Sequence, residues 1–417
     1  MNAIGQISPN EWLQDSDIAE IFTLLDNQAL FVGGCVRDAL LGYPVKDIDL
    51  ATKLLPEEVQ ARLNAAGIKT IPAGISFGMV MALTRRHNRA IEITTLRKDI
   101  ATDGRHAVVS FGTDWYEDAL RRDFTINAFY ADKDGLVYDP LDNFEDLSAG
   151  RIRFIGNPEQ RIKEDALRIL RFFRFYAYYG HESMDKTALN AIKANAFMLQ
   201  KLSKERIKEE FFKIIMSPRP DIILKAMEQS GVLAFIDKEI HDIPALNQLV
   251  WLETRGIVLK GLQPDLIRRL AVILPLSPDK IMAQKKNLRL SNLQKKRLCE
   301  LSLEGEILAA LKNIGILKTL YKYGKENVID SLLLAFARQR AGACHLSFAE
   351  DEPFITLLEE ASSAEIPQFP LHGADLKALG FSGKSLGEKL TELEKTWLDY
   401  NFSLDKNQLL EYVQKKV

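Results

Sequence analysis

The spacing of hydrophobic and polar residues changes along this chain. Up to about Asp146, short apolar runs that are typical of strands alternate with helical segments. From about Arg161 onward, apolar residues recur at intervals of three and four, which is the period of an amphipathic helix. The pattern therefore predicts an α+β region with a small mixed sheet, followed by a region that is helical almost throughout.

Four strands are expected in the first region. They are Ala29–Val32, Lys46–Ala51, Met79–Thr84 and Ala90–Leu96. A helix is expected to follow the first strand over Cys35–Leu41. Ser8 and Pro9 are expected to open a helix near the N-terminus, because serine caps helices and proline suits their first position.

Composition and charge narrow the class of protein. The chain has 417 residues, which is enough for several domains with buried cores. Its formal net charge of -2 gives no general signal for nucleic-acid binding, so an RNA partner would need local basic surfaces. The three cysteines lack metal-ligand spacing, and the N-terminal segment has no apolar core of a signal peptide. No apolar stretch approaches the length of a membrane span, so we expect a cytoplasmic protein.

The most informative motif joins two glycines to two aspartates. Gly33 and Gly34 end the first strand, and their missing Cβ atoms would let a bulky anion approach the backbone. The N-terminus of the following helix offers free N–H groups to phosphate, and Arg37 in its first turn could donate to the same anion. Asp47 and Asp49 are two apart on the second strand, so both carboxylates would face one side and could hold Mg²⁺.

Each half of this motif is weak alone, because a Gly-Gly pair is usually only a turn and an Asp-x-Asp pair is usually solvated. The order strand, Gly-Gly, helix, strand, Asp-x-Asp is more specific. It resembles the nucleotidyltransferase superfamily related to DNA polymerase β. Glu92, in the strand-like segment Ala90–Thr95, has two interpretations. It is either an outward-facing residue of an amphipathic sheet or a third carboxylate beside the aspartate pair.

A second group of polar residues lies in the segment Arg121–Ala128. Asp123 and Asn127 are four apart and would share a helical face, where they could hydrogen-bond a ribose hydroxyl. Arg121 or Arg122 could reach a phosphate. The alternative is a capped helix with a solvated arginine pair.

The third group opens a long helix that is expected from Arg161 onward. Asp165 and Arg168 are three apart and would share one surface of this helix. One interpretation is an intrahelical salt bridge. The other is a template made of protein, in which the carboxylate accepts from the exocyclic amine of cytosine or adenine and the guanidinium donates to the adjacent ring acceptors. Guanine and uracil would oppose a carbonyl to the carboxylate, so the same pair would reject them.

Taken together, the motifs GGCVRD, DIDLAT, RRDFTINA and EDALRILRFFRF resemble the class II tRNA nucleotidyltransferases, the CCA-adding enzymes, and the similar bacterial poly(A) polymerases. The resemblance implies a catalytic, polymerase-β-like nucleotidyltransferase head followed by an all-α neck, body and tail. The neck would recognise the nucleotide base, and the tail would bind tRNA. The implied boundaries are 1–150 for the head, 151–216 for the neck, 217–330 for the body and 331–417 for the tail.

The same resemblance implies a role for each candidate residue. Mg²⁺ would be held by Asp47 and Asp49. Glu92 is a candidate third catalytic carboxylate on the second of its two interpretations above, and not through the resemblance. The residues that would bind the nucleotide are Gly33, Gly34, Arg37, Arg122, Asp123, Asn127, Asp165, Arg168 and Arg171. The substrates would be CTP and ATP, which would be added to the 3′ end of a tRNA.

A tRNA partner would be recognised along its acceptor and TΨC stem, by shape and by phosphate contacts. The candidate basic residues are Lys285, Lys286, Arg289, Lys295, Lys296, Arg297 and Lys384. Each of them could equally belong to a solvated helix face. We expect a monomer or a homodimer.

Three alternatives stay open. Poly(A) polymerases share the head motifs, but they usually carry a strongly basic C-terminal extension, and this sequence closes on Gln414–Val417 without one. That difference favours CCA addition. A partial enzyme that adds only CC or only A would share the same motifs. A non-catalytic RNA-binding protein on the same fold is the third alternative, against which the intact aspartate pair and glycines argue.

Overall fold

The computed structural model describes residues 1–71, 74–102, 107–255, 259–343 and 347–414. These residues form two compact units. The N-terminal unit comprises Met1–Lys238 together with Asn287–Arg289, and the C-terminal unit comprises the other described residues. The finer division into head, neck, body and tail stays a prediction.

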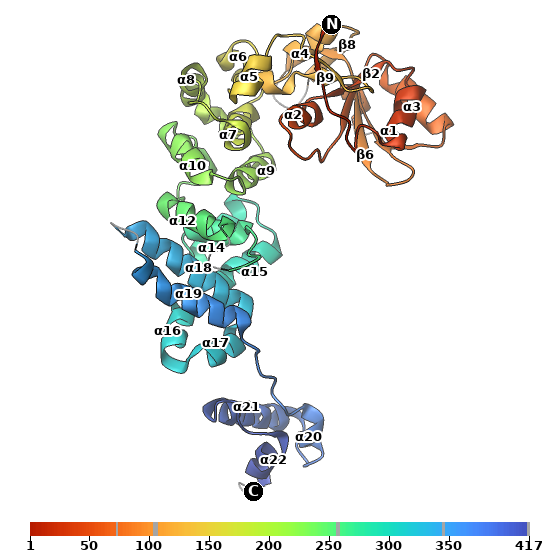
Figure 1. The fold of residues 1–417 in the computed structure, drawn as a ribbon. Helices are drawn as coiled ribbons and strands as arrows, with labels where there is room; N and C mark the ends of the chain where they lie inside the picture. The colour runs from red at the N-terminus through yellow and green to blue at the C-terminus, as the bar shows by residue number, and fades with distance from the viewer. Residues whose placement is uncertain (72–73, 103–106, 256–258, 344–346, 415–417) are drawn as a thin grey trace. The chain divides into compact units, whose positions relative to one another are not determined.

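A mixed sheet forms the centre of the N-terminal unit (Figure 1). Its eight strands lie in the order β1-β10-β9-β2-β3-β6-β5-β4. Only the pair β3 and β6 runs parallel within this sheet. A separate two-stranded ribbon joins β7 and β8. The strand bounds are β1 Ala3–Gln6, β2 Ala29–Val32, β3 Asp49–Thr52, β4 Lys69–Ile71, β5 Met79–Leu83, β6 Ala90–Thr95, β7 Arg97–Thr102, β8 Ala107–Phe111, β9 Tyr130–Ala131 and β10 Leu136–Tyr138.

The α+β prediction is confirmed, and the sheet is larger than expected. β2, β5 and β6 match three predicted strands closely, whereas β3 begins at Asp49, three residues later than predicted. Among the strands that the hydrophobic pattern did not reveal, β9 has only two residues and β10 has three. Such segments cannot show a period of two, and they are held by pairing with neighbours far away in the sequence.

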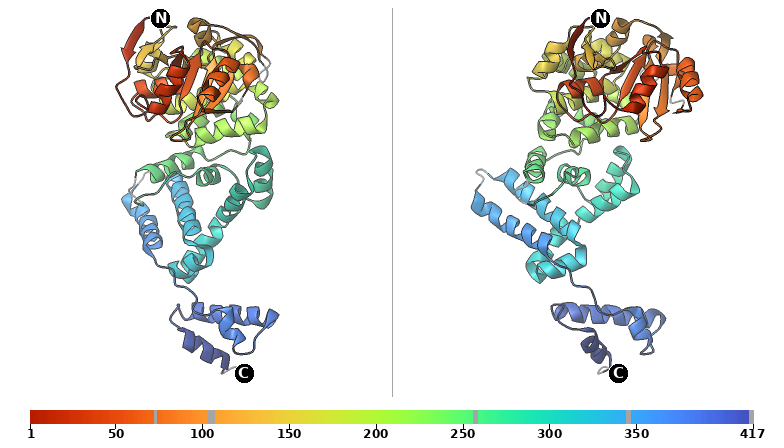
Figure 2. Two further views of the ribbon diagram at one scale, coloured as in Figure 1. Left: turned by 90° about the vertical axis from the view of Figure 1, so that its right-hand side faces the viewer. Right: turned by 45° about the vertical axis from the view of Figure 1, so that its right-hand side comes forward.

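Helices cover both faces of the sheet. α1 (Ser16–Leu24) and α3 (Pro56–Ala65) lie on one face, and α2 (Gly34–Leu40) lies on the other (Figures 1 and 2). On the first face, the Phe31 ring of β2 packs 4.9 Å from the ring of Phe22 in α1. The expected helix start at Ser8 and Pro9 is wrong: α1 begins at Ser16, because the Asp15 carboxylate accepts the free N–H of Asp17 at 2.9 Å.

Helices also make up the rest of the N-terminal unit, and α7 packs along α9. The α-helices are α4 Trp115–Leu120, α5 Phe144–Ala149, α6 Pro158–Glu164, α7 Leu167–Tyr179, α8 Lys186–Asn195, α9 Lys204–Ile215, α10 Pro220–Gln229 and α11 Leu233–Ile236. The 3₁₀ helices are η1 Ile75–Phe77, η2 Thr125–Asn127 and η3 Ala196–Lys201.

In the C-terminal unit the described secondary structure is entirely helical, as expected for the region after the head. The helices are α12 Ile243–Thr254, α13 Leu266–Ile273, α14 Pro278–Asn287, α15 Asn292–Leu301, α16 Glu304–Ile314, α17 Ile316–Tyr323, α18 Lys325–Gly342, α19 Phe348–Ser363, α20 Gly373–Lys377, α21 Gly383–Asp399 and α22 Lys406–Gln414. The central helix α18 packs against α12, α13, α15, α16 and α19. No described helix combines the length and the apolar character that a membrane crossing requires.

A buried ion network holds the centre of this unit. The Glu253 carboxylate, with no exposed side-chain surface, accepts from Arg268 at 2.8 Å and from Arg269 at 2.7 Å. Arg268 also donates to Asp330 of α18 at 2.8 Å. Removing one member of such a network leaves the opposite charges buried without compensation, which costs far more than losing an exposed pair.

We predict that Glu253→Gln lowers the free energy of unfolding of the C-terminal unit by about 3 kcal/mol or more. Urea unfolding monitored by circular dichroism measures the change. The control is Glu388→Gln, which removes one carboxylate of an exposed pair with Lys384 and should leave the transition nearly unchanged, because solvent already screens that pair. Equal shifts for the two variants would show that the buried network is not a major stabilising element.

Candidate active site

The two glycines form a tight turn between β2 and α2. Gly33 has a φ of 71° and a ψ of −119°, a combination that only glycine adopts easily, and its N–H donates to the Phe129 carbonyl at 3.2 Å. A Cβ atom on Gly33 would lie 3.5 Å from Nη1 of Arg122, and one on Gly34 would lie 3.7 Å from Nη2 of Arg37. The missing side chains therefore keep open the space between the turn and two guanidinium groups. The expected helix after the turn is confirmed as α2.

Three carboxylates gather beside this turn. Asp49 opens β3 and is in register with Glu92 of the parallel strand β6. Leu50 pairs with Phe31, which packs on α1, so the adjacent Asp49 faces the opposite side of the sheet. Asp47 is exposed and precedes the buried Ile48. The Cys35 thiol at the start of α2 lies 3.8 Å from the Asp49 carbonyl oxygen, which ties the strand to the turn.

The charges of this acidic group are only partly offset. Burial raises the pKa of Asp49 to about 6, and repulsion from Glu92 and Asp47 adds to the effect, against an opposing contribution from Arg122. Burial also raises the pKa of Glu92, although a hydrogen bond from Thr94 and the positive charges of Arg97 and Arg122 oppose the shift. A set of hard oxygen donors with surplus negative charge fits a divalent cation such as Mg²⁺.

Arg122 lies between the glycine turn and a buried carboxylate. Its Nη2 donates to Oδ2 of Asp118 in α4 at 3.0 Å, and its Nε lies 3.2 Å from the Tyr130 hydroxyl. Because Nη1 is the atom that approaches the Cβ position of Gly33, the guanidinium has one edge held by protein and one edge directed at the turn. This arrangement suits an anion bound at the turn.

The predicted pair Asp123 and Asn127 is in contact, although the helix expected to carry it does not form. Phe124 is extended and bridges to Phe154, and only a 3₁₀ turn begins at Thr125. Nδ2 of Asn127 still donates to Oδ1 of Asp123 at 3.0 Å. The expected contact between the two side chains therefore forms, but the backbone between them bends and is not α-helical.

A row of polar side chains extends from this pair to α2 and α7. Oδ1 of Asn127 accepts from Nη1 of Arg37 at 2.6 Å, and Oδ2 of Asp123 accepts from Arg171 of α7 at 2.6 Å. The buried Arg37 also donates to Asp38 at 2.9 Å and to the hydroxyl of Tyr179 at 2.7 Å, and it stacks 4.1 Å above the Tyr179 ring. These bonds already engage the guanidinium, so Arg37 would have to exchange one of them to donate to a phosphate. Its expected role as a phosphate donor stays a prediction.

The long helix expected from Arg161 is two helices. α6 ends at Glu164, and Asp165 adopts an extended conformation with a φ of −150° and a ψ of 108° before α7 begins. The Asp165 carboxylate accepts the N–H of Leu167 at 3.0 Å, as a capping residue does. Asp165 therefore lies at a helix junction instead of on a continuous helical surface.

The intrahelical Asp165–Arg168 salt bridge, one of the two interpretations of this pair, does not form. Oδ2 of Asp165 accepts from Arg206 of α9 at 2.8 Å, whereas Nη1 of Arg168 donates to Glu164 at 2.6 Å. Both residues still belong to the polar cluster around Asp123, because Arg168 helps to lower the pKa of Asp123 and Asp165 helps to raise that of Arg171. A base-reading role for the pair stays a prediction.

Several residues that position this site were given no role in it from the sequence. Arg206 and Glu210 are four apart on the α9 face toward α7, where Arg206 bonds to Asp165, and Glu210 accepts from Arg174 at 2.6 Å. This i, i+4 pair was visible in the sequence, but a charged pair on a helix usually faces solvent. Asp118 was the other omission, and only its burial distinguishes it from an ordinary acidic residue.

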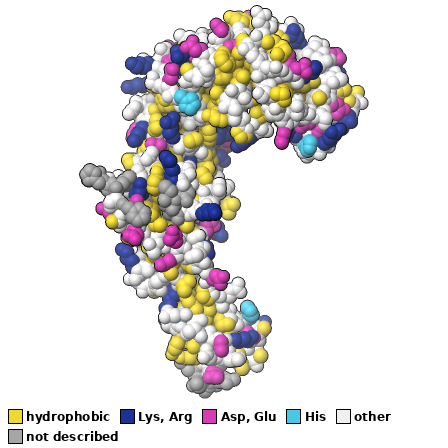
Figure 3. Space-filling view, in the orientation of Figure 1, with side chains coloured by type: hydrophobic (Ala, Val, Ile, Leu, Met, Phe, Trp, Pro, Cys, Tyr) yellow, Lys and Arg dark blue, Asp and Glu magenta, His cyan; other side chains and the backbone are white. Residues whose placement is uncertain are grey.

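The candidate RNA-binding residues have different surroundings. Arg297 is paired with Asp330 at 2.5 Å and with Glu326, whereas Lys384 has a side chain that is 92% exposed. Arg289 pairs with Glu205 at 3.0 Å, and Lys285 donates to Asn292 at 2.8 Å. Of the three remaining candidates, Lys286 and Lys296 are exposed and Lys295 is half-buried. Acidic and basic side chains are interspersed on the face shown in Figure 3, and the RNA contacts stay a prediction.

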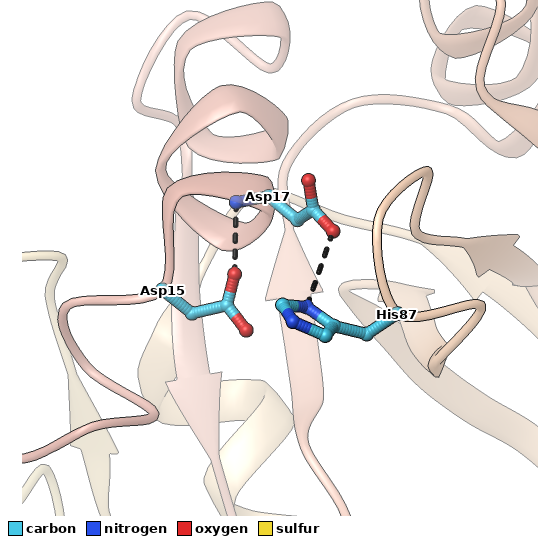
Figure 4. A group of neighbouring side chains, drawn as sticks. All are labelled: Asp15, Asp17 and His87. Atoms are coloured by element: carbon cyan, nitrogen blue, oxygen red, sulfur yellow. Dashed lines mark hydrogen bonds and ion pairs between the residues drawn. The ribbon is translucent and has the colours of Figure 1, made fainter.

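A second acidic group lies elsewhere in the N-terminal unit. Among the described residues, Asp15, Asp17 and His87 are the group whose possible metal-ligand atoms all lie within 4.8 Å of one another (Figure 4). Asp15 caps α1, and Asp17 accepts the backbone N–H of Arg86 at 3.1 Å. Arg86 and Arg89 also lie within 4.0 Å of these carboxylates. The local charges are thus largely compensated, unlike those at Asp49.

Comparison with known proteins defines the class. Residues 29–153 match the family described as "Poly A polymerase head domain", and residues 183–243 match the one described as "Probable RNA and SrmB- binding site of polymerase A". The mixed sheet, the glycine turn and the adjoining carboxylates agree with the first match. The chain is a nucleotidyltransferase of the class that contains poly(A) polymerases and CCA-adding enzymes.

The relatives identify the family within this class. The chain is 33% identical over 410 residues to the human protein named CCA tRNA nucleotidyltransferase 1, mitochondrial, covering 95% of this chain and 89% of that protein. It is 30% identical to a CCA-adding enzyme of Limosilactobacillus fermentum, covering 92% of each chain. A Bacillus stearothermophilus CCA-adding enzyme solved in complex with CTP superposes with a TM-score of 0.69 at 27% identity, covering 96% of this chain and 98% of that one. The chain belongs to the CCA tRNA nucleotidyltransferase family, as the motifs indicated.

We predict that Asp123 makes stability depend on pH in acid. Burial raises its pKa, but Arg171, Asn127 and Arg168 outweigh burial and lower the pKa from 3.8 to about 2. A carboxyl whose pKa is lower in the folded state stabilises the fold above its unfolded pKa, and this contribution is lost as the pH falls through its folded pKa. The difference in unfolding free energy between wild type and Asp123→Asn should therefore shrink by about 2 kcal/mol between pH 4 and pH 2. Urea unfolding over this range measures it, and a constant difference would contradict the assignment.

Proposed function

We propose that the protein adds C, C and A to the 3′ end of tRNA from CTP and ATP without a nucleic-acid template. The observation that carries the proposal is the register of Asp49 with Glu92 beside the glycine turn that faces Arg122. Membership of the CCA tRNA nucleotidyltransferase family supports it. The cluster of Asp123, Asp165 and Arg168 in the same compact unit provides polar groups of the kind that base recognition requires.

The cofactor that we propose is Mg²⁺, held by Asp47 and Asp49, with Glu92 supplying further negative charge. Burial, together with repulsion from Glu92 and Asp47, raises the pKa of Asp49. A cation would relieve this repulsion, which supports the assignment. Such a cation, when bound, lowers the pKa of the attacking RNA hydroxyl and neutralises charge on the leaving group.

The protein's own groups then position the reactants. The backbone of Gly33 and Gly34 and the free edge of Arg122 receive the triphosphate, and Asp123 with Asn127 contacts the ribose. The RNA 3′-oxygen attacks the α-phosphorus, a new phosphodiester bond forms, and the bond to the β-phosphate oxygen breaks to release pyrophosphate. Catalysis is therefore mainly positioning and neutralisation of charge.

Base selection follows from hydrogen-bond polarity. The carboxylate of Asp165 accepts from the amine N4 of cytosine or N6 of adenine, and Arg168 donates to N3 and O2 of cytosine or to N1 of adenine. In the free protein these groups are bonded to Arg206 and Glu164, so the base takes over bonds that the protein already makes. Guanine and uracil would leave a carbonyl facing Asp165, which is costly in a buried site.

The helical parts provide the remaining functions in this proposal. The neck at 151–216 carries base recognition, the body at 217–330 links it to the tail, and the tail at 331–417 binds tRNA through phosphate contacts of the candidate lysines and arginines. We propose a monomer or homodimer in the cytoplasm. The relatives whose names include "mitochondrial" make a mitochondrial location the alternative.

We predict that the purified protein incorporates C, then C, then A into tRNA that lacks its 3′ end, and that Asp49→Asn abolishes incorporation while tRNA binding persists. Labelled CTP, ATP, GTP and UTP are each supplied to tRNA ending before C, after C and after CC, and products are resolved on gels. Asp134→Asn, an exposed carboxylate paired with Lys133, is the matched control and should retain full activity. Long adenylate products on unstructured RNA would favour poly(A) synthesis, and addition of only CC or only A would identify a partial enzyme.

The base-reading assignment makes a separate prediction. Arg168→Ala should reduce discrimination against UTP by about tenfold or more, because one charge-assisted hydrogen bond contributes about 1.5–3 kcal/mol. The ratio of kcat/KM for CTP to that for UTP measures this. Lys163→Ala, which removes an exposed cation paired with Glu159 on α6, serves as the control. A ratio that stays the same in Arg168→Ala would remove Arg168 from the base-reading site.

A further inference from the structure

We propose that Asp118 is a positioning residue that holds the Arg122 guanidinium in the orientation that receives the nucleotide's phosphates. The inference rests on the proposed function, because it takes Arg122 to be a phosphate ligand. It adds a residue that no sequence motif singled out, and it assigns to that residue a task that can be separated from stability.

The bonding of Asp118 is unusually complete for a buried carboxylate. Its side chain has no exposed surface, and Oδ2 accepts from Nη2 of Arg122 at 3.0 Å and from the Tyr130 hydroxyl at 2.8 Å. Oδ1 accepts from Nε of Arg121 at 2.8 Å. Burial raises the pKa of Asp118, but Arg122 and Arg121 outweigh burial and lower it, so the group is ionised at neutral pH.

These bonds determine which N–H groups of Arg122 stay available to a ligand. Asp118 and the Tyr130 hydroxyl engage the edge formed by Nε and Nη2. Because the guanidinium is planar, fixing that edge also fixes the direction of Nη1. Nη1 is the atom 3.5 Å from the Cβ position of Gly33, and it has no hydrogen-bond partner among the described residues. The free donor is therefore directed at the glycine turn by the bonds that Asp118 makes.

Arg122 needs such a restraint because other carboxylates compete for it. Its charge lowers the pKa of both Asp49 and Glu92, so both lie within its electrostatic reach. An untethered guanidinium would pair with these partly exposed acids, and it would then oppose the cation proposed to bind there. Asp118 offers a buried partner on the other side, and Tyr130, which packs edge-on to Trp115 at 5.2 Å, adds a second bond.

Equilibrium binding of CTP with Mg²⁺ tests the proposal in a double-mutant cycle. The proteins are wild type, Asp118→Asn, Arg122→Gln and the double variant. If Asp118 acts through Arg122, Asp118→Asn should weaken CTP binding by about tenfold or more, and the double variant should bind no more weakly than Arg122→Gln alone. Asp134→Asn, the same change at an exposed carboxylate paired with Lys133, is the matched control and should bind CTP like wild type.

Tyr130→Phe provides a second variant if Asp118→Asn does not fold. It removes only the hydroxyl and keeps the buried ring, and it should weaken CTP binding by a smaller factor that disappears in the Arg122→Gln background. Independent, multiplicative losses would overturn the inference, as would normal affinity in Asp118→Asn or, where that variant does not fold, in Tyr130→Phe. If wild type itself binds no CTP, the proposed function fails, and the positioning inference fails with it. Weak binding by Arg122→Gln beside normal binding by Asp118→Asn would refute the positioning role alone.

Discussion

The site depends on the half-buried carboxylate of Asp49, which Glu92 and Asp47 both repel. Two strands from separate parts of the sequence bring Asp49 and Glu92 into register, although like charges on adjacent strands destabilise a sheet. Burial and this repulsion raise the pKa of Asp49 to about 6. We propose that these carboxylates bind a cation strongly beside the glycine turn, where the phosphates would lie.

The second feature is the continuity of polar contacts away from this acidic group. Arg37 of α2, Asn127, Asp123 and Arg171 of α7 form an unbroken row of short bonds. The row joins the helix of the glycine turn to the helix whose start carries Asp165 and Arg168. Groups proposed to contact phosphate, sugar and base are thus fixed relative to one another within the N-terminal unit. Such pre-arrangement reduces the ordering that a bound nucleotide would otherwise require.

The sequence predicted the elements whose signal is local. β2, the glycine turn and α2 follow from an apolar run, two glycines and the helical segment after them, and each was expected within a residue of its observed bounds. The break at Asp165 was missed, because Ile162, Ile169 and Leu170 are all buried and keep the helical period across the junction. Only the bond from the Asp165 side chain to a backbone N–H reveals the break, and such local competition leaves no periodic trace.

Ion pairs that form because one partner is buried could not be predicted from the sequence either. Asp118 and Arg122 are four apart on α4 and the turn after it, as in many exposed ion pairs, and nothing in the sequence shows that Asp118 has no exposed surface. The same limit applied to Arg297, which looked like a surface cation but is bonded to the buried Asp330. Charge type and spacing predict which residues can interact, whereas the choice between solvent and protein partners is made by tertiary packing.

The position of a bound cation tests most directly whether Asp47 and Asp49 form a metal site. Crystals grown with CTP and Mn²⁺ in place of Mg²⁺ would give an anomalous signal at the metal. We predict a peak between the carboxylates of Asp47 and Asp49 and the phosphate oxygens, with the triphosphate against Gly33 and Gly34. A peak at Asp15, Asp17 and His87 alone, or a triphosphate bound away from the glycine turn, would contradict it.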